Sequence, residues 1–259
     1  HESPASRVGS EMCIRDSHTA GNYPGSWYAA TAPLMGAFPG LLGDISTDVC
    51  VIGGGYSGLS TALHLRQKGY EVVLLEAERI AWGASGRNGG HVGTGQRADQ
   101  SSIEKWVGEE AAKGLWQLGL DAVQKVCDLI NEHNIDCELG SGNLHLAAKP
   151  SHAVELQDEL AHLESQYGYQ QLTYLTPEAV AERTSARGFH GGLLDDGCKH
   201  LHPLKYALGL ARAASEAGVK IYEGTRGHPQ ADGQSGEVKT ENGRVKARHI
   251  VIGCNAYLG

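Results

Sequence analysis

Three closely spaced glycines are the most informative chemical feature of this 259-residue chain. Gly53, Gly55 and Gly58 have the spacing of the GxGxxG turn that binds the pyrophosphate of a dinucleotide. The first glycine permits a tight turn, the second lets the backbone approach the phosphates, and the third lets a helix pack closely on the preceding strand. The backbone N–H groups of Tyr56 and Ser57 are expected at the positive end of that helix. The pattern predicts a dinucleotide-binding site.

Glu76 is the acidic residue expected to complete this site. It follows Gly58 by 18 residues, near the spacing at which a carboxylate accepts hydrogen bonds from the adenosine ribose. The alternative interpretation is a solvated acid at the end of a strand.

A βαβ unit would position these residues. A short apolar run at 48–52 leads into the glycine turn, a helical stripe follows from Leu59 to Leu65, and Gly69 ends the helix. A second continuous apolar run at 72–75 reads as a buried parallel strand. The strand, turn, helix, second strand and acidic residue therefore follow one another in the order expected of a βαβ unit.

A second glycine-rich segment, GASGRNGGH at 83–91, follows this unit directly. An NAD-binding domain would instead continue to alternate strands and helices. Four glycines within 83–90 favour a backbone packed against something flat or charged, and a flexible surface loop is the alternative. Both FAD and NAD bind to the GxGxxG fingerprint. The two glycine segments favour one cofactor held by both, which points to FAD and leaves a nicotinamide cofactor as the alternative.

Three segments together resemble the FAD-dependent D-amino-acid oxidase (DAO) superfamily, and most closely its gamma-glutamylputrescine oxidase branch. They are VCVIGGGYSGLSTALHL, LLEAERIAWGASGRNGG and HLHPLKYALGLARAA, and the resemblance extends from about Trp27 to the C-terminus. It implies FAD as cofactor, with the first motif at the ADP half and the second running past the pyrophosphate toward the isoalloxazine ring. The cofactor contacts expected from the motif and the resemblance are Gly53, Gly55, Tyr56, Ser57, Gly58, Glu76, Ala77, Arg79, Gly83, Ala84, Ser85, Arg87, Asn88, Gly89, Gly90, Gly227, Cys254 and Asn255.

Gly227 departs from the pattern of the resembling family. That family usually has a β-branched residue, commonly Val, at this position, where the backbone touches the adenine. A backbone contact can survive the change.

The predicted fold is α/β, a Rossmann-like FAD-binding domain of the glutathione-reductase type with an inserted, incomplete α+β substrate domain. Residues 1–26 are expected to be a disordered or non-native tail. The FAD-binding domain is expected at 27–135 and 199–259, and part of the substrate domain at 136–198. By resemblance, the chain looks like a C-terminally truncated member of the family.

Further elements are read from periodicity and turn residues. Helices are expected at 111–130 and 153–168, and a second helix–glycine–strand–acid series at 206–223. Asn242-Gly243 predicts a hairpin joining 237–240 to 244–247, after which a buried strand is expected to resume at 249–253.

The resemblance implies oxidation of an amine C–N bond to an imine and then an aldehyde, with oxygen reduced to hydrogen peroxide. The donor would be gamma-glutamylputrescine-like, or another primary or secondary amine or amino acid. The alternatives are an FAD amine dehydrogenase that uses a quinone or carrier acceptor, and an inactive flavin-binding fragment. His91, directly after the second glycine segment, is the candidate catalytic residue for proton handling, and a structural histidine is the alternative.

Composition limits the partners. Lys and Arg number 22 against 30 Asp and Glu, a net charge of −8, and no basic run exceeds two residues, which argues against nucleic acid. No apolar run is long enough for a membrane span. The six cysteines form no CxxC pair or zinc spacing, so we expect no metal and interpret them as buried thiols in a reducing, cytoplasmic compartment. The expected partners are a small-molecule amine and oxygen or another electron acceptor.

Overall fold

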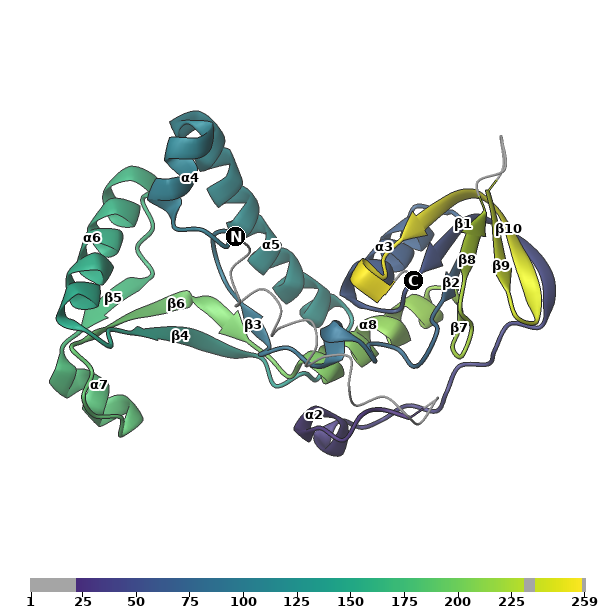
Figure 1. Cartoon of the computed structure of the whole chain (residues 1–259), viewed down its shortest axis with the longest axis horizontal. Helices are drawn as coiled ribbons and strands as arrows, with labels where there is room; N and C mark the ends of the chain where they lie inside the picture. The colour runs from purple at the N-terminus through teal and green to yellow at the C-terminus, as the bar shows by residue number, and fades with distance from the viewer. Residues whose placement is uncertain (1–21, 231–235, 258–259) are drawn as a thin grey trace, which may run out of the picture. The chain divides into compact units, whose positions relative to one another are not determined.

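The computed structural model describes residues 22–230 and 236–257, and these form two compact units (Figure 1). Of the described residues, the first unit comprises 22–89, 129–137, 202–230 and 236–257, and the second comprises 90–128 and 138–201. The sequence placed all of 27–135 in the cofactor domain, whereas the structure assigns 90–128 to the second unit.

A six-stranded sheet with the order β7-β2-β1-β10-β9-β8 forms the centre of the first unit. Strands β8 (His228–Gln230) and β9 (Gly236–Thr240) add an antiparallel edge to a parallel core. The parallel strands are β7 (Lys220–Tyr222), β2 (Val72–Leu75), β1 (Gly43–Ile52) and β10 (Gly243–Ile252).

The predicted βαβ unit is confirmed. All four residues of β2 and the last four of β1 are buried, as expected for strands covered on both faces. Helix α3 (Tyr56–Gln67) follows the glycine turn and buries Leu59, Ala62 and Leu63. Helix α8 (Pro203–Glu216) packs beside α3, and His202 caps its first turn by accepting from the Lys205 N–H.

The predicted hairpin across Asn242-Gly243 is confirmed, whereas the strand expected to resume at 249–253 is a continuation of β10, and its residues are half-buried or exposed instead of buried. Strand β10 runs without a break from Gly243 to Ile252 and pairs with β1 along its whole length. Its polar interruption, Arg248, is 77% exposed and pairs with Asp48 at 3.2 Å. A solvent-facing residue within a strand therefore looked like a break between two strands.

The second unit contains an antiparallel sheet. Strand β6 (Gly192–His200) pairs with β3 (His91–Val92), β4 (Gly140–Leu146) and β5 (Leu172–Leu175). The helices of this part are α4 (Gln100–Val107), α5 (Glu109–Glu132, whose last turn belongs to the first unit), α6 (Pro150–Tyr167) and α7 (Pro177–Thr184). The expected helices at 111–130 and 153–168 are confirmed, whereas β6 was not anticipated and contains the proposed boundary at 198/199.

Strand β6 contains Asp195, a polar residue held by partners from several segments. One carboxylate oxygen accepts from the Tyr169 hydroxyl at 2.6 Å, and the other accepts from the Thr94 hydroxyl at 3.1 Å and from the Cys198 thiol at 3.0 Å. Burial, followed by the bond to Asp195, raises the pKa of Tyr169, which keeps its hydroxyl a donor. These contacts satisfy an aspartate inside a sheet.

The N-terminal segment makes defined contacts from Asn22 onward. The Trp82 indole donates to the Asn22 carbonyl at 3.0 Å, and Ser26 caps α2 (Trp27–Thr31). The structure therefore differs from the expected tail at 22–26, while 1–21 lie outside the described residues.

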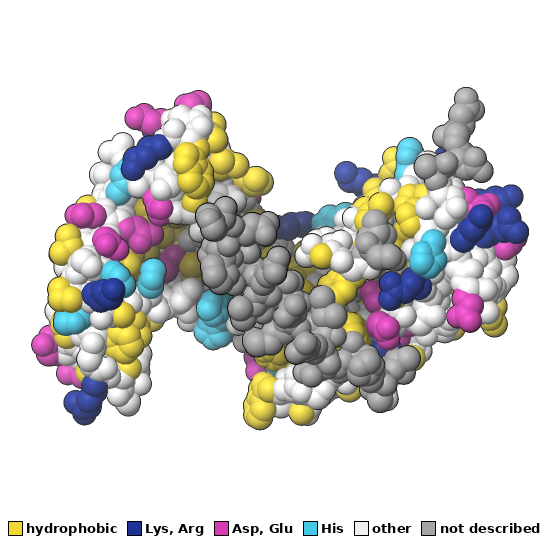
Figure 2. Space-filling model, viewed as in Figure 1, with side chains coloured by type: hydrophobic (Ala, Val, Ile, Leu, Met, Phe, Trp, Pro, Cys, Tyr) yellow, Lys and Arg dark blue, Asp and Glu magenta, His cyan; other side chains and the backbone are white. Residues whose placement is uncertain are grey.

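The five cysteines of the described part are free. Cys50, Cys137 and Cys198 are buried as expected, whereas Cys127 and Cys254 are only half-buried, and Cys13 lies outside the described residues. No helix within 22–230 or 236–257 has the length and apolar character needed to cross a bilayer. On the face drawn in Figure 2, described acidic and basic side chains are interspersed over both units.

Candidate cofactor site

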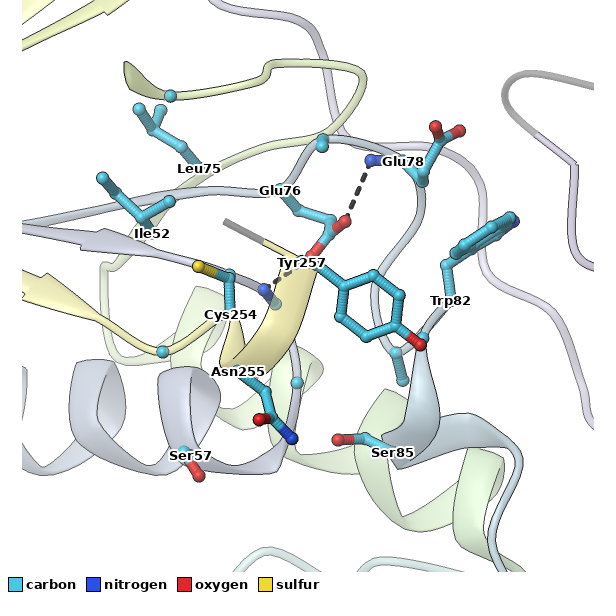
Figure 3. A pocket seen from close by; sticks show the side chains of 18 of the residues that line it. Ile52, Ser57, Leu75, Glu76, Glu78, Trp82, Ser85, Cys254, Asn255 and Tyr257 are labelled. Carbon is cyan, nitrogen blue, oxygen red and sulfur yellow. Dashed lines mark hydrogen bonds between the residues drawn. The ribbon is translucent and has the colours of Figure 1, made fainter. Parts of the chain in front are cut away.

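A cavity of about 410 Å³ lies in the first unit, where β1, β2 and β10 end (Figure 3). Ligands of parallel α/β sheets bind at the carboxyl ends of the strands, so the position is that of a cofactor site. Twelve of the residues expected from the sequence line it: Gly53, Gly55, Tyr56, Ser57, Glu76, Ala77, Gly83, Ala84, Ser85, Gly227, Cys254 and Asn255.

The glycine turn is shaped by close backbone approaches. Gly53 has φ +109°, a conformation that favours glycine, and a Cβ there would lie 2.8 Å from the Gly253 carbonyl oxygen. A Cβ on Gly55 would lie 2.8 Å from the Ser85 hydroxyl oxygen. A Cβ on Gly58 would collide with the Gly53 carbonyl oxygen, so this glycine lets α3 begin directly against β1.

The N-terminus of α3 faces the cavity with its positive end. The helix has no acidic residue in its first turn and no side-chain cap, so no negative side chain of its own competes there for an anion. The Tyr56 N–H donates to the Ser85 hydroxyl at 3.1 Å, which joins the two glycine segments. Burial raises the pKa of the Tyr56 hydroxyl to about 12, and this hydroxyl donates to the Pro203 carbonyl at 3.0 Å.

Glu76 lies at the end of β2 and turns its carboxylate back toward the glycine turn (Figure 3). One oxygen accepts from the Gly54 N–H at 2.6 Å and the other from the Glu78 N–H at 2.9 Å. Burial raises the pKa of this carboxyl, against the lowering effect of the two backbone bonds. Each oxygen retains a second acceptor position, as a pair of ribose hydroxyls would need.

Six of the expected cofactor contacts do not line the cavity, namely Gly58, Arg79, Arg87, Asn88, Gly89 and Gly90, and neither does the candidate catalytic residue His91. Gly58 lies behind the turn, and Arg79 pairs with Glu223 at 3.0 Å. Asn88 donates to the carbonyls of Ala84 and Ser85, and so supports the short 3₁₀ helix η1 (Ala84–Gly86) at the cavity wall.

Arg87 lies just behind this wall. Its guanidinium stacks over the Trp82 ring at 4.7 Å, and its Nε donates to the Gly83 carbonyl at 3.4 Å. Its Nη2 is buried and has no hydrogen-bond partner among the described residues. A buried guanidinium nitrogen without an acceptor is suited to an anionic group.

Gly90 and His91 belong to the second unit. His91 is exposed on β3 and lies opposite His200 in the β3–β6 register. His91 therefore pairs within the antiparallel sheet of the second unit, and its role in proton transfer stays a prediction.

Ten lining residues were not anticipated: Ile52, Gly54, Leu75, Glu78, Ala81, Trp82, Arg226, His228, Gly253 and Tyr257. Ile52 and Leu75 end parallel strands, so the strand-end rule could have found them. Trp82 and Tyr257 carry no such signal, because only tertiary folding brings their rings to the cavity (Figure 3).

The position of Gly227 shows why a larger residue does not fit here. An added Cβ would lie 2.9 Å from Val238 Cγ1 and 3.1 Å from Leu75 Cδ1. In this chain, strand side chains occupy the space that a β-branched residue would need.

A family model described as FAD dependent oxidoreductase (DAO) matches residues 48–259. The chain belongs to the DAO family. It is 38% identical over 235 residues to "Probable oxidoreductase OrdL" of Rhizobium meliloti, covering 90% of this chain and 55% of that protein. It is 37% identical over 234 residues to "Gamma-glutamylputrescine oxidoreductase" of Escherichia coli, with the same coverage of 90% and 55%. The chain thus spans about half the length of the curated DAO relatives it matches.

Solved structures share the fold. L-Amino acid deaminase from Proteus myxofaciens aligns with a TM-score of 0.71 at 20% identity, covering 88% of this chain and 49% of that one. Glycine oxidase from Geobacillus kaustophilus aligns with a TM-score of 0.66 at 23% identity, covering 82% and 56%. The predicted α/β FAD-binding fold is confirmed for this DAO-family chain.

Proposed function

We propose that the chain binds FAD in the cavity of the first unit. The pyrophosphate would lie at the N-terminus of α3, and the adenosine ribose would donate its hydroxyl hydrogens to Glu76. The observation that carries this proposal is that both glycine segments and the Glu76 carboxylate converge on one cavity at the ends of parallel strands. The residues proposed as FAD contacts are the twelve expected residues that line the cavity, together with Arg87, whose buried Nη2 has no acceptor among the described residues.

The reaction we propose is oxidation of an amine C–N bond. Bound FAD would accept the hydride equivalent from the carbon next to nitrogen. The amine would become an imine, and water would add to it and release an aldehyde and the smaller amine. The two electrons taken from the amine, with two protons, would then pass from the cofactor to O2 and form hydrogen peroxide. The support for an amine donor is the DAO family and the 37% identity to gamma-glutamylputrescine oxidoreductase.

This chain's own residues would orient the cofactor and substrate. An alkyl amine has a pKa of about 10, so the site must favour its neutral form before oxidation. His91 is our candidate for handling that proton, because it directly follows the second glycine segment and its imidazole is exposed. We propose the second unit as part of the substrate domain.

The test is a visible absorption spectrum of the purified chain before and after addition of FAD, FMN or NAD. Flavin bands that remain through gel filtration with FAD, and not with FMN, would support a site built for the adenosine half. Anaerobic bleaching by an amine, followed by peroxide formation in air, would support an oxidase, whereas bleaching without peroxide would favour a dehydrogenase. A chain that retains NAD and not FAD would contradict the proposal.

A further inference from the structure

Loop 76–82 carries five of the residues that line the cavity: Glu76, Ala77, Glu78, Ala81 and Trp82. It leaves the sheet at the end of β2, so strand pairing alone does not determine its course. Its backbone instead bonds to the turn after β7: Gly224 N–H donates to the Glu78 carbonyl at 3.0 Å, and Thr225 N–H donates to the Glu76 carbonyl at 2.8 Å.

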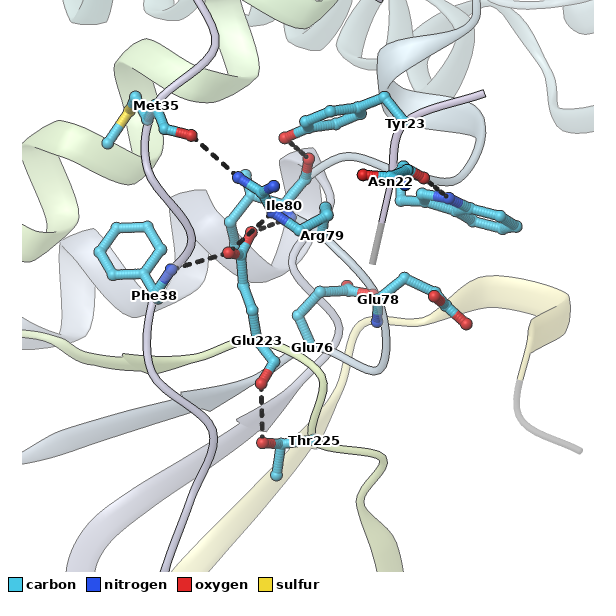
Figure 4. A network of polar contacts seen from close by, with 11 residues as sticks. Asn22, Tyr23, Met35, Phe38, Glu76, Glu78, Arg79, Ile80, Glu223 and Thr225 are labelled. Atoms are coloured by element: carbon cyan, nitrogen blue, oxygen red, sulfur yellow. Dashed lines mark hydrogen bonds and ion pairs between the residues drawn. The ribbon is translucent and has the colours of Figure 1, made fainter. Parts of the chain in front are cut away.

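Glu223 lies at the centre of this attachment and is only 4% exposed (Figure 4). One carboxylate oxygen accepts from the Ile80 N–H at 2.6 Å. The other accepts from the Phe38 N–H at 2.8 Å and from Arg79 Nε at 3.0 Å. One buried carboxylate thereby joins the N-terminal segment, the cavity loop and the turn after β7.

Arg79 is engaged on the same side of the loop. Its second donor contacts the Met35 carbonyl at 2.9 Å, and its guanidinium lies over the Tyr23 ring at 5.2 Å. The Tyr23 hydroxyl donates to the Ile80 carbonyl at 2.9 Å. In Figure 4, Met35 contacts Arg79 and Tyr23 contacts Ile80, while Arg79 and Ile80 themselves contact Glu223. Arg79 is not among the residues that line the cavity.

We propose that Arg79 and Glu223 are positioning residues of the FAD site. Their ion pair holds segment 35–41 against loop 76–82 and thereby holds the loop conformation in which the Glu76 carboxylate faces the cavity. Neither residue touches the cofactor. The inference deepens the proposed function and rests on it, because the loop matters for binding only if the cavity holds FAD.

We call the Arg79–Glu223 pair and the backbone groups that it binds the clamp. The clamp requires a carboxylate at Glu223. A carboxylate offers about four acceptor positions and can serve three donors at once, whereas an amide presents one oxygen and places its own NH₂ against a donor. Arg79 in turn needs a planar fork to reach Glu223 and the Met35 carbonyl together, which a lysine does not provide.

The test is FAD affinity, measured by flavin fluorescence titration of the purified chain, together with the thermal unfolding midpoint of each variant. We expect Glu223→Gln and Arg79→Met each to raise the Kd for FAD about tenfold, and Arg79→Lys to raise it less. The double variant should stay within about twofold of the weaker single variant, because both changes open one clamp.

The matched control is Glu71→Gln. Glu71 pairs with Arg66 at 2.8 Å in the same unit, is more than half exposed, and does not line the cavity. We expect its Kd for FAD to stay within about twofold of the unchanged chain.

Four results would overturn the inference. A lower unfolding midpoint with an unchanged Kd would make the pair merely structural. A loss in Arg79→Met without a loss in Glu223→Gln would make Arg79 a direct cofactor contact. If the unchanged chain and Glu71→Gln bind no FAD, the proposed function fails and the clamp fails with it. If the unchanged chain, Glu71→Gln and the clamp variants all bind FAD equally well, only the clamp is rejected.

Discussion

The two sheets of this protein differ in where their polar side chains lie relative to the buried strands. In the first unit, β1 and β2 end in fully buried apolar runs, and at that end of the sheet the polar contacts begin where the strands stop. In the second unit, β6 carries Asp195 within the strand and satisfies it with Tyr169, Thr94 and Cys198. The first pattern is visible in a few consecutive residues, whereas the second depends on partners as far as 101 positions away.

The largest loss of stability and of FAD binding is expected at Gly58, where α3 meets β1 in the first unit. An alanine Cβ would collide with the Gly53 carbonyl, so α3 must shift from β1 and the glycine turn must open. We expect Gly58→Ala to lower the free energy of unfolding by about 3 kcal/mol and to abolish measurable FAD binding. Urea unfolding followed by circular dichroism, with an FAD titration, measures both.

The control for this change is Gly114→Ala in α5. A Cβ on Gly114 meets nothing within 4 Å, so the change should stabilise the helix by about 0.8 kcal/mol. Equal stability of the two variants would contradict the close approach assigned to Gly58.

A smaller loss is expected at Asp195. Removing its carboxylate leaves the hydroxyls of Tyr169 and Thr94 without their acceptor. We expect Asp195→Ala to cost about 2 kcal/mol in the free energy of unfolding, measured in urea. Asp196→Ala changes the exposed neighbour and should stay within about 0.5 kcal/mol of the unchanged chain. Equal losses in the two variants would mean that the Asp195 contacts contribute nothing beyond strand propensity.

The third prediction concerns pH and Glu76. Burial raises the pKa of this carboxyl, so it takes up a proton as the pH falls through that raised value. The protonated form is a poorer acceptor for ribose hydroxyls, so FAD binding should weaken about tenfold as the pH falls from the neutral into the acidic range. An FAD titration across this range measures the effect, and Glu76→Gln should bind weakly with a flat profile.

The stability of the protein without FAD should respond to this group in the opposite direction. A carboxyl whose folded-state pKa is raised stabilises the fold fully below its unfolded value, and this contribution is lost as the pH rises through the folded value. FAD affinity that is independent of pH in the unchanged chain would remove Glu76 from the ribose site.

Local signals were sufficient for much of the first unit. The apolar run at 72–75, the glycine turn and Asn242-Gly243 each describe their structure within a few residues. The same signals pointed to segments that line the cavity, because the turn and both strand ends belong to one edge of the sheet.

Other features depend on distant partners, and the sequence did not reveal them. Arg79 follows Glu76 closely enough to suggest a cofactor contact, yet it pairs with Glu223, 144 positions away. Trp82 and Tyr257 reach the cavity only through folding, and β6 was not anticipated because Asp195-Asp196-Gly197 resembles a turn.

The pairing of β1 with β10 also has a consequence for synthesis of the chain. Each partner in β10 lies 200 positions after its counterpart in β1, as Gly43 pairs with Gly243. At about 5–20 residues per second, the ribosome needs about 10–40 s to make the missing partner, while all of 90–201 emerges in between. During that interval one edge of β1 offers unpaired backbone groups, which are a template for aggregation. The cofactor unit therefore cannot close its sheet until synthesis of β10 is complete.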